Sequence, residues 1–116
     1  GNSNLSYVWM LDSNVKNFDS LAECLALRNI SLTDTIVDDY IINSDGNFTM
    51  KDSGFLSSFD NVTELGIYID IIEDVSGICE MDSLKSLSVS EGTISDQAID
   101  QLEKKGIKVA QKKIDD

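Results

Sequence analysis

Carboxylates are the side chains of this sequence best suited to chemistry. Two adjacent pairs occur, Asp38-Asp39 and Glu73-Asp74, and acid–base catalysis needs two carboxylates held in contrasting environments. Neighbouring side chains on a strand or turn point apart, so both pairs are expected to be surface charge. The chain contains no histidine, which removes the commonest general base and the Ser-His and Cys-His nucleophile pairs. The sequence therefore predicts a protein without catalytic residues that is not an enzyme.

Motifs for metals and cofactors are also incomplete. Residues 45–47 (Asp-Gly-Asn) resemble part of a calcium loop, but its closing Glu is missing because position 56 is Leu. There is no glycine-rich phosphate cradle. Cys24 and Cys79 are too few and too far apart for a disulfide framework or a zinc site. Two buried thiols are favoured over one bridge, and this favours a reducing compartment. We expect no metal and no cofactor.

The charge is strongly negative and unevenly distributed. The net charge is −12, and residues 1–100 carry 18 acidic and 4 basic residues, whereas residues 101–116 carry 3 acidic and 5 basic ones. Such a field repels nucleic acid and anionic lipid and attracts a basic partner. The alternative explanation is that the acidity only maintains solubility. No apolar run approaches the roughly 20 residues of a membrane-spanning helix. We therefore expect neither a nucleic-acid partner nor a membrane association.

An apolar spacing repeats along the chain. Val62-x-x-Leu65-x-Ile67 recurs 22 residues later as Leu84-x-x-Leu87-x-Val89. A period near 22 residues is typical of a solenoid, in which each unit contributes one short strand and buries its apolar side against its neighbours. The expected strand anchors are Tyr40, Leu65, Leu87 and Ile107, separated by 25, 22 and 20 residues. Strands joined by returns of this length run parallel.

Local signals predict the elements in between. We expect a buried strand over residues 5–11 and a helix over 18–28 capped by Asn17, with Phe18, Leu21, Ala22 and Leu25 on its inner face. Ser95 or Asp96 should cap a helix over residues 96–105 that ends at Gly106 in a left-handed conformation. The remaining expected elements are strands over 35–43, 63–69 and 85–90, a strand from residue 107, a turn at 44–47, a helical turn over 53–60 and a return through 73–83.

Two segments carry a resemblance to a known family. Residues 54–67 and 75–89 resemble leucine-rich repeats of the short 22-residue kind found in bacterial internalins, and residues 96–109 are similar to the helix and strand that close many bacterial repeat arrays. The family's asparagine after the strand is replaced by Asp70 in one unit and by Gly92 in the next. The resemblance implies a fold and a binding role, and it implies no chemistry.

These observations predict an α/β, leucine-rich-repeat-like single domain, residues 1–116. A mostly parallel sheet should form one face, with short helices and turns on the other. Residues 1–34 should form an N-terminal capping strand and helix, residues 35–111 the repeat-like region, and residues 112–116 a frayed tail. Tyr7 and Trp9 are expected to pack in the core or cap, and a surface anchor is the alternative.

Alternation along the strands predicts an outward face that binds a partner. We expect this face to be acidic, with an apolar and aromatic element at Ile41 and Tyr68. The predicted partner-binding residues are Asp39, Ile41, Asn43, Glu64, Tyr68, Asp70, Ser86, Ser88 and Ser90.

The resemblance, the size and the acidity together suggest a function. Our hypothesis is an immunity protein that neutralises a basic bacterial toxin, acting as an antitoxin through an acidic surface. The alternative is a secreted or surface leucine-rich-repeat domain that binds a host protein or glycan. Residues 1–15 lack a basic start followed by an apolar stretch, so we expect a cytoplasmic protein, with secretion after removal of a signal peptide as the alternative. The oligomeric state is left open.

Overall fold

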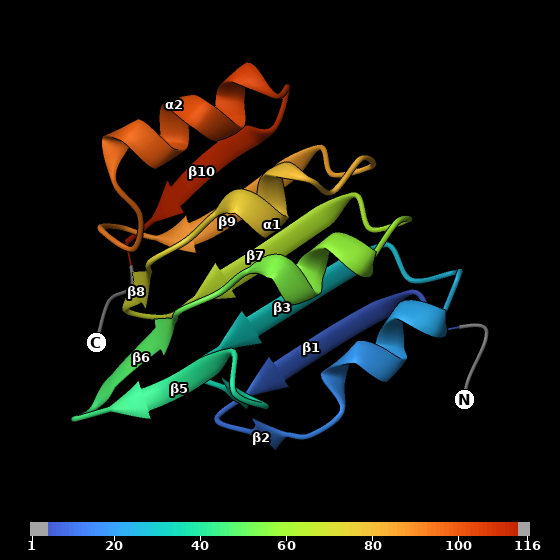
Figure 1. Ribbon diagram of the computed structural model, residues 1–116, viewed down its shortest axis with the longest axis horizontal. Helices are drawn as coiled ribbons and strands as arrows, with labels where there is room; N and C mark the ends of the chain where they lie inside the picture. The colour runs from blue at the N-terminus through green and yellow to red at the C-terminus, as the bar shows by residue number, and fades with distance from the viewer. Residues whose placement is uncertain (1–4, 114–116) are drawn as a thin grey trace.

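A five-stranded parallel sheet is the main element of the fold. The computed structural model describes residues 5–113. The sheet, sheet A, has the strand order β1-β3-β7-β9-β10 (Figure 1). All four neighbouring pairs are parallel. The strands are β1 (Tyr7–Leu11), β3 (Asn29–Thr33), β7 (Glu64–Tyr68), β9 (Ser86–Ser90) and β10 (Lys108–Lys112). The expected α/β fold with a mostly parallel sheet is therefore confirmed.

A second, mixed sheet lies at the ends of these strands. Sheet B has the order β2-β4-β5-β6-β8, and the hairpin of β5 and β6 projects at the lower left of Figure 1. β5 is antiparallel to both β4 and β6, whereas the β2–β4 and β6–β8 pairs are parallel. Its strands are β2 (Asn14–Val15), β4 (Ile36–Val37), β5 (Ile41–Ser44), β6 (Asn47–Met50) and β8 (Ile71–Ile72).

Short helices cover one face of sheet A (Figure 1). They are η1 (Phe18–Glu23), η2 (Gly54–Ser58), α1 (Ser76–Cys79) and α2 (Asp96–Lys104). α2 has the predicted ends: the Ser95 side chain accepts a hydrogen bond from the Ala98 N–H at 3.1 Å, and Gly106 has a φ of 89°. A serine cap and a left-handed glycine satisfy the unpaired backbone groups at the two helix ends.

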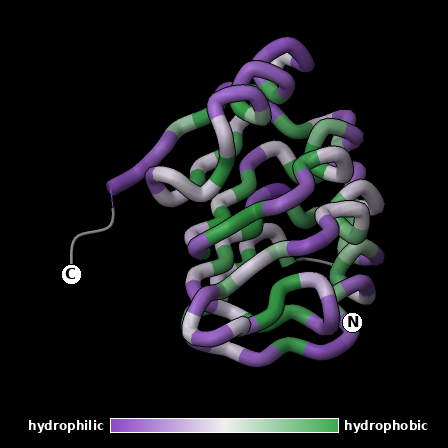
Figure 2. The backbone as a smooth tube through the Cα atoms, turned by 60° about the vertical axis from the view of Figure 1, so that its left-hand side comes forward, coloured by the Kyte–Doolittle hydropathy of each residue, from purple (hydrophilic) through white to green (hydrophobic). Residues whose placement is uncertain are grey.

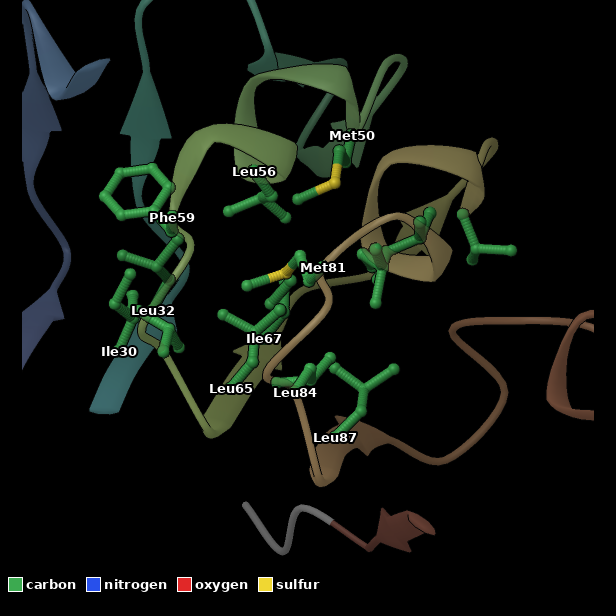
Figure 3. Packing of buried hydrophobic residues seen from close by; sticks show 14 of the residues in the cluster. Ile30, Leu32, Met50, Leu56, Phe59, Leu65, Ile67, Met81, Leu84 and Leu87 are labelled. Atoms are coloured by element: carbon green, nitrogen blue, oxygen red, sulfur yellow. The ribbon is translucent and has the colours of Figure 1, made fainter. Parts of the chain in front are cut away.

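The core lies between sheet A and the helices. Alternate strand residues such as Leu65, Ile67 and Leu87 point into it and meet Leu56 and Met81 from the helical side (Figure 3). Figure 2 shows hydrophobic segments inside the stack and hydrophilic ones on many of the turns around it. Burial of each strand thus depends on the units before and after it, because one strand and one return are too small to enclose a core.

The strand register follows the period found in the sequence. Tyr7 pairs with Asn29, Glu64 with Ser86, and Ser86 with Lys108, and the interval between the partners is the same in all three pairs. It equals the interval that separates Leu65 from Leu87 in the apolar repeat. The exception is the longer step from Asn29 to Glu64, which are paired across β3 and β7.

Sheet B accounts for this longer step. Val15 pairs with Val37, and Met50 pairs with Ile72, again at the interval of the repeat. Between these two pairs, Ile41 of β5 pairs with Val37 on one side and with Met50 on the other. Residues 38–50, which contain the β5–β6 hairpin, are therefore an insertion in one repeating unit.

The strand predicted over residues 35–43 is wrong. Its place beside β7 is taken by β3, so the anchor of that layer is Ile30 and not Tyr40. The physical reason is the backbone at Asp34 and Asp38, whose φ angles of 44° and 45° are left-handed and end β3 and β4. Aspartate tolerates this conformation better than most residues, and a continuous strand cannot contain it.

Three further expectations need correction. The helix over residues 18–28 is only the 3-10 helix η1, and Leu25, expected on its inner face, is 71% exposed. Asn17 is left-handed and its side chain does not cap η1. The Asp38 carboxylate accepts hydrogen bonds from the N–H groups of Asn17 at 2.8 Å and Phe18 at 3.0 Å instead. The predicted tail, residues 112–116, begins one residue inside β10, and residues 114–116 lie outside the described range.

Candidate protein-binding face

The face of sheet A opposite the helices is uncovered within the described chain. Parallel sheets are usually covered on both faces, so this arrangement needs a reason. The register aligns every second side chain into three rows across the strands. We call these fifteen residues the open face: Tyr7, Asn29, Glu64, Ser86 and Lys108; Trp9, Ser31, Gly66, Ser88 and Ala110; Leu11, Thr33, Tyr68, Ser90 and Lys112.

Large apolar side chains are concentrated at one edge of the open face. Tyr7, Trp9 and Leu11 of β1 are 53%, 61% and 49% exposed. The expectation that Tyr7 and Trp9 pack in the core or cap is therefore wrong, and the surface alternative is found. Because the side chains of a strand alternate, burial of Val8 on the helical side places its neighbours on the open side.

Tyr68 occupies the middle of the open face. A Cβ atom placed on Gly66 would lie 3.1 Å from Cε2 of Tyr68, 3.3 Å from its hydroxyl oxygen and 3.4 Å from Oγ of Ser31. The Tyr68 ring is thus folded back along its own strand over Gly66. Glycine at position 66 gives the ring room to lie along the sheet.

Small polar residues surround this ring. The side-chain amide of Asn29 donates a hydrogen bond to Oε2 of Glu64 at 2.7 Å, across the β3–β7 pair. Ser31, Gly66, Ser86 and Ser88 add short side chains, and together with Tyr7, Asn29 and Glu64 they line a hollow of about 270 Å³. Between Tyr7, Glu64 and Tyr68 the lining is mostly of short side chains, so a partner could approach the sheet closely there.

A row of acids follows the carboxyl ends of the strands. Asp12, Asp34, Asp70 and Glu91 come one or two residues after β1, β3, β7 and β9, and we call them the strand-end carboxylates. Three of them, Asp34, Asp70 and Glu91, line a hollow of about 450 Å³ with Lys113. Parallel strands end at one edge of a sheet, so these charges gather beside the third row of the open face.

Two of the strand-end carboxylates act on a third, Asp34. Burial raises the pKa of Asp34, and the negative charges of Asp70 and Asp12 raise it further. Asp70 also has a structural role, because its carboxylate accepts a hydrogen bond from the Phe48 N–H at 2.8 Å and so helps to hold β6 beside β8. The edge therefore carries a concentrated negative field that favours positively charged groups.

The structure brings most of the predicted residues together. Glu64, Tyr68, Ser86, Ser88 and Ser90 belong to the open face. Asp70 lies next to it, among the strand-end carboxylates.

The other three predicted residues lie elsewhere. Asp39 is in the exposed turn between β4 and β5, and Asn43 is in the hairpin, where its side-chain oxygen accepts a hydrogen bond from the Gly46 N–H at 3.0 Å. Ile41, expected to be exposed, is fully buried and pairs with Met50. The predicted strand over residues 35–43, which would carry all three, is broken at Asp38 and replaced by the inserted hairpin.

The expected acidity of the face itself is also wrong. Glu64 is the single acid of the open face, and Lys108 and Lys112 lie on its β10 edge. The negative charge lies instead at the strand ends.

Sequence reasoning missed the part of the open face that β1 and β3 contribute. The residues concerned are Tyr7, Trp9 and Leu11 of β1 and Asn29, Ser31 and Thr33 of β3. A signal was present, since Val8-x-Met10 recurs 22 residues later as Ile30-x-Leu32.

Comparison with known proteins gives no relative: no family model matches the chain, and no curated protein matches it in sequence.

Within residues 5–113, no three His, Cys, Asp or Glu side chains are grouped so that they could hold a metal ion. Cys24 and Cys79 are partly buried and are not joined by a disulfide, and burial is the main cause that raises the pKa of the Cys79 thiol. In the same part of the chain, the helices are too short or too polar to cross a bilayer.

Proposed function

We propose that this chain is a non-enzymatic protein-binding module that docks a basic protein on the open face of sheet A. One observation carries the proposal: an uncovered parallel sheet carries the exposed Tyr7 and Trp9, and Tyr68 of the same face lines a hollow with three of the strand-end carboxylates. Tyr and Trp bury large areas with few rotatable bonds and are typical anchors of binding energy. Charges beside such anchors select the partner and accelerate its association. The matching partner presents apolar side chains next to Lys or Arg.

We also infer that the chain is built from leucine-rich-repeat-like units. The recurring interval between paired strands in both sheets supports this, as do buried hydrogen bonds between successive units. Oγ1 of Thr93 donates to the Ile69 carbonyl at 2.8 Å, and the Gly77 N–H donates to Oγ of Ser53 at 2.9 Å, both across 24 residues. Contacts restricted to neighbouring units are characteristic of solenoids.

Within this class, we favour an immunity protein that neutralises a basic bacterial toxin. Toxins that attack nucleic acid need a positive surface, and an acidic protein that covers such a surface blocks access to the substrate. The net charge of −12 and the strand-end carboxylates support this choice. The toxin assignment follows from analogy between surfaces, because a fold alone does not determine a function.

The test uses basic proteins from the native host that bind to this chain. Each bound protein that proves toxic is expressed in bacteria, and the survival of those bacteria is measured. Co-expression of the chain should restore colony formation. Trp9→Ala and Tyr68→Ala should each reduce this rescue by about tenfold or more, the effect of losing one binding anchor. Gln97→Ala, on the exposed side of α2, is the matched control and should rescue fully.

Two outcomes would count against the proposal. If no captured protein is toxic, or if the chain gives no rescue, the immunity function is rejected. If the Trp9 and Tyr68 variants rescue as well as the unchanged chain, the open face is not the docking surface.

The second candidate is a secreted or surface domain that binds a host protein or glycan. The observation that favours it is the position of Trp9 and Tyr7 beside Asn29 and Ser31, because a sugar can stack on an aromatic ring and bond to amides and hydroxyls. Trp9 is the only tryptophan of the chain, so its fluorescence reports on this site alone. A saturable change in emission with defined oligosaccharides would favour this candidate over the first.

A further inference from the structure

We propose that the free edge of β1 accepts an added β-strand from the basic partner. The inference rests on the proposed function and specifies how the partner engages the open face. β1 pairs only with β3 among the described strands, so its other edge has no strand neighbour. An extended segment placed there would continue sheet A by main-chain hydrogen bonds, as in other cases of strand addition.

β1 differs from the other sheet edges in lacking protection. Natural edge strands are usually blunted by short length, lysine or proline. β10, the opposite edge of sheet A, carries Lys108 and Lys112, and the edges of sheet B, β2 and β8, have two residues each. β1 has five residues, Tyr-Val-Trp-Met-Leu, without charge or proline. An unprotected edge of this kind is expected to be covered by a binding partner when the protein functions.

The backbone of β1 is oriented for such pairing. The Ser6 carbonyl accepts hydrogen bonds from the N–H groups of Arg28 and Asn29, and the Asp12 N–H donates to the Thr33 carbonyl at 3.1 Å. Residues 6 and 12 therefore face β3. Successive residues of a strand direct their N–H and C=O groups to alternate sides. The groups of Tyr7, Trp9 and Leu11 consequently point to the free edge.

The surroundings of β1 define the chemistry of the added strand. Its outward side chains would lie beside Tyr7, Trp9 and Leu11, which favours apolar or β-branched residues. Asp12 follows β1 directly, with Asp34 after the neighbouring strand, so a lysine or arginine at one end of the added strand would meet the strand-end carboxylates. A second copy of this chain fits less well, because each copy carries a net charge of −12.

The experiment uses a tethered probe strand. The peptide Lys-Val-Thr-Val-Thr-Val-Lys is fused ahead of Gly1 of the full chain through a flexible Gly/Ser linker, which gives an effective concentration of about 1 mM. Amide hydrogen exchange is then followed residue by residue by NMR. In the chain without the probe, Val8 and Met10 should exchange slowly and Tyr7, Trp9 and Leu11 quickly. The probe should slow exchange at those three residues by about tenfold or more.

The matched control replaces both lysines of the probe by glutamate. It should protect the three amides at least several-fold less, because the strand-end carboxylates repel it. Unchanged exchange in β7 and β9 verifies that each fusion is folded.

Three results would overturn the inference. Absence of protection at residues 7, 9 and 11 excludes strand addition, and equal protection by both probes excludes a basic partner at this edge. Protection that grows with the concentration of the unfused chain shows that a second copy occupies the edge. The probe needs no toxin, so its result is independent of the survival assay. Protection without rescue rejects the immunity function alone, whereas rescue without protection rejects strand addition alone.

Discussion

Leu87 and Trp9 are both large apolar residues of sheet A, yet they face opposite sides of it. Leu87 is fully buried against the helices, and Trp9 is 61% exposed on the open face. Leu87→Ala should lower the free energy of unfolding by about 2–5 kcal/mol, because it removes buried methyl groups and leaves a cavity. Trp9→Ala should change it by about 0.5 kcal/mol or less. Urea denaturation measures both. A large loss of stability in Trp9→Ala would mean that this ring supports the fold and is not a free anchor.

Asp34 should make stability depend on pH. The fold raises the pKa of its carboxyl above 3.8, mainly through burial and then through Asp70 and Asp12. At pH values between the ordinary and the raised pKa, the native state therefore retains a proton that the unfolded chain has lost. The free energy of unfolding falls as pH rises through this range, and its full loss is reached above the raised pKa. Asp34→Asn should raise the urea midpoint at about pH 7 and leave it unchanged at about pH 3.

Asn is a suitable replacement because it tolerates the left-handed φ of 44° at this position. A lower midpoint for Asp34→Asn at neutral pH would contradict the expected sign.

At the scale of elements, the contact between α1 and η2 depends on Gly77. A Cβ atom at this position would lie 2.0 Å from the Ser53 carbonyl oxygen, and backbone atoms cannot move aside cheaply. Gly77→Ala should therefore lower the free energy of unfolding by about 1–3 kcal/mol or more. Gly66→Ala is the matched control, since its added methyl meets the movable ring of Tyr68. Thermal or urea unfolding should show a much lower stability for Gly77→Ala than for Gly66→Ala. Equal losses of stability in the two variants would contradict this account.

Elements with local signals could be predicted from the sequence. α2 has a serine cap and a left-handed glycine within its own segment, and β7 and β9 share an undisturbed repeat spacing. The part of the open face on β7 and β9 followed from that spacing. β3 could not be placed beside β7, because residues 38–50 are inserted between the two strands. The exposure of Leu25 also escaped prediction, because the helix that would have buried it ends at Glu23. The exposure of Trp9 could have been inferred from the recurrence of Val8-x-Met10 as Ile30-x-Leu32.

The β5–β6 hairpin should be removable without loss of the fold. Val37 pairs with Val15, and Met50 pairs with Ile72, each at the interval of the repeat. Deletion of residues 38–50 should therefore let β4 pair directly with β8. It also removes the Asp38 carboxylate that binds η1 and the stacking of Tyr40 on Phe55, so stability should fall by roughly 2–5 kcal/mol, comparable to a large core truncation.

NMR contacts between Val37 and Ile72 would verify the new pairing in the shortened chain. A chain that does not fold after the deletion would show that the hairpin is an integral part of the core, and the repeat interpretation would fail.

At the scale of the whole molecule, the proposed contact surface and most of the negative charge near it occupy different places. The open face supplies apolar and small polar groups with one acid, and the strand-end carboxylates stand along one of its margins. This separation is favourable for a fast and tight complex. Charges at the rim steer the partner without being desolvated, whereas the central contacts exclude water.

The position of the acids, and not only their number, should therefore govern association. Neutralising the four strand-end carboxylates (Asp12→Asn, Asp34→Asn, Asp70→Asn, Glu91→Gln) should lower the association rate constant with the basic partner by about tenfold at low salt and flatten its dependence on ionic strength. The matched control neutralises four exposed acids on turns or helix ends before the strands: Asp60, Glu80, Asp82 and Glu103. Both variants change the net charge equally. Stopped-flow fluorescence of Trp9 measures both rates. The two variants are compared at about 0.1 M salt, where screened interactions decay within about 10 Å, so distant acids should contribute little. If the two variants slow association equally, steering arises from net charge alone, and the strand-end carboxylates have no special role in docking.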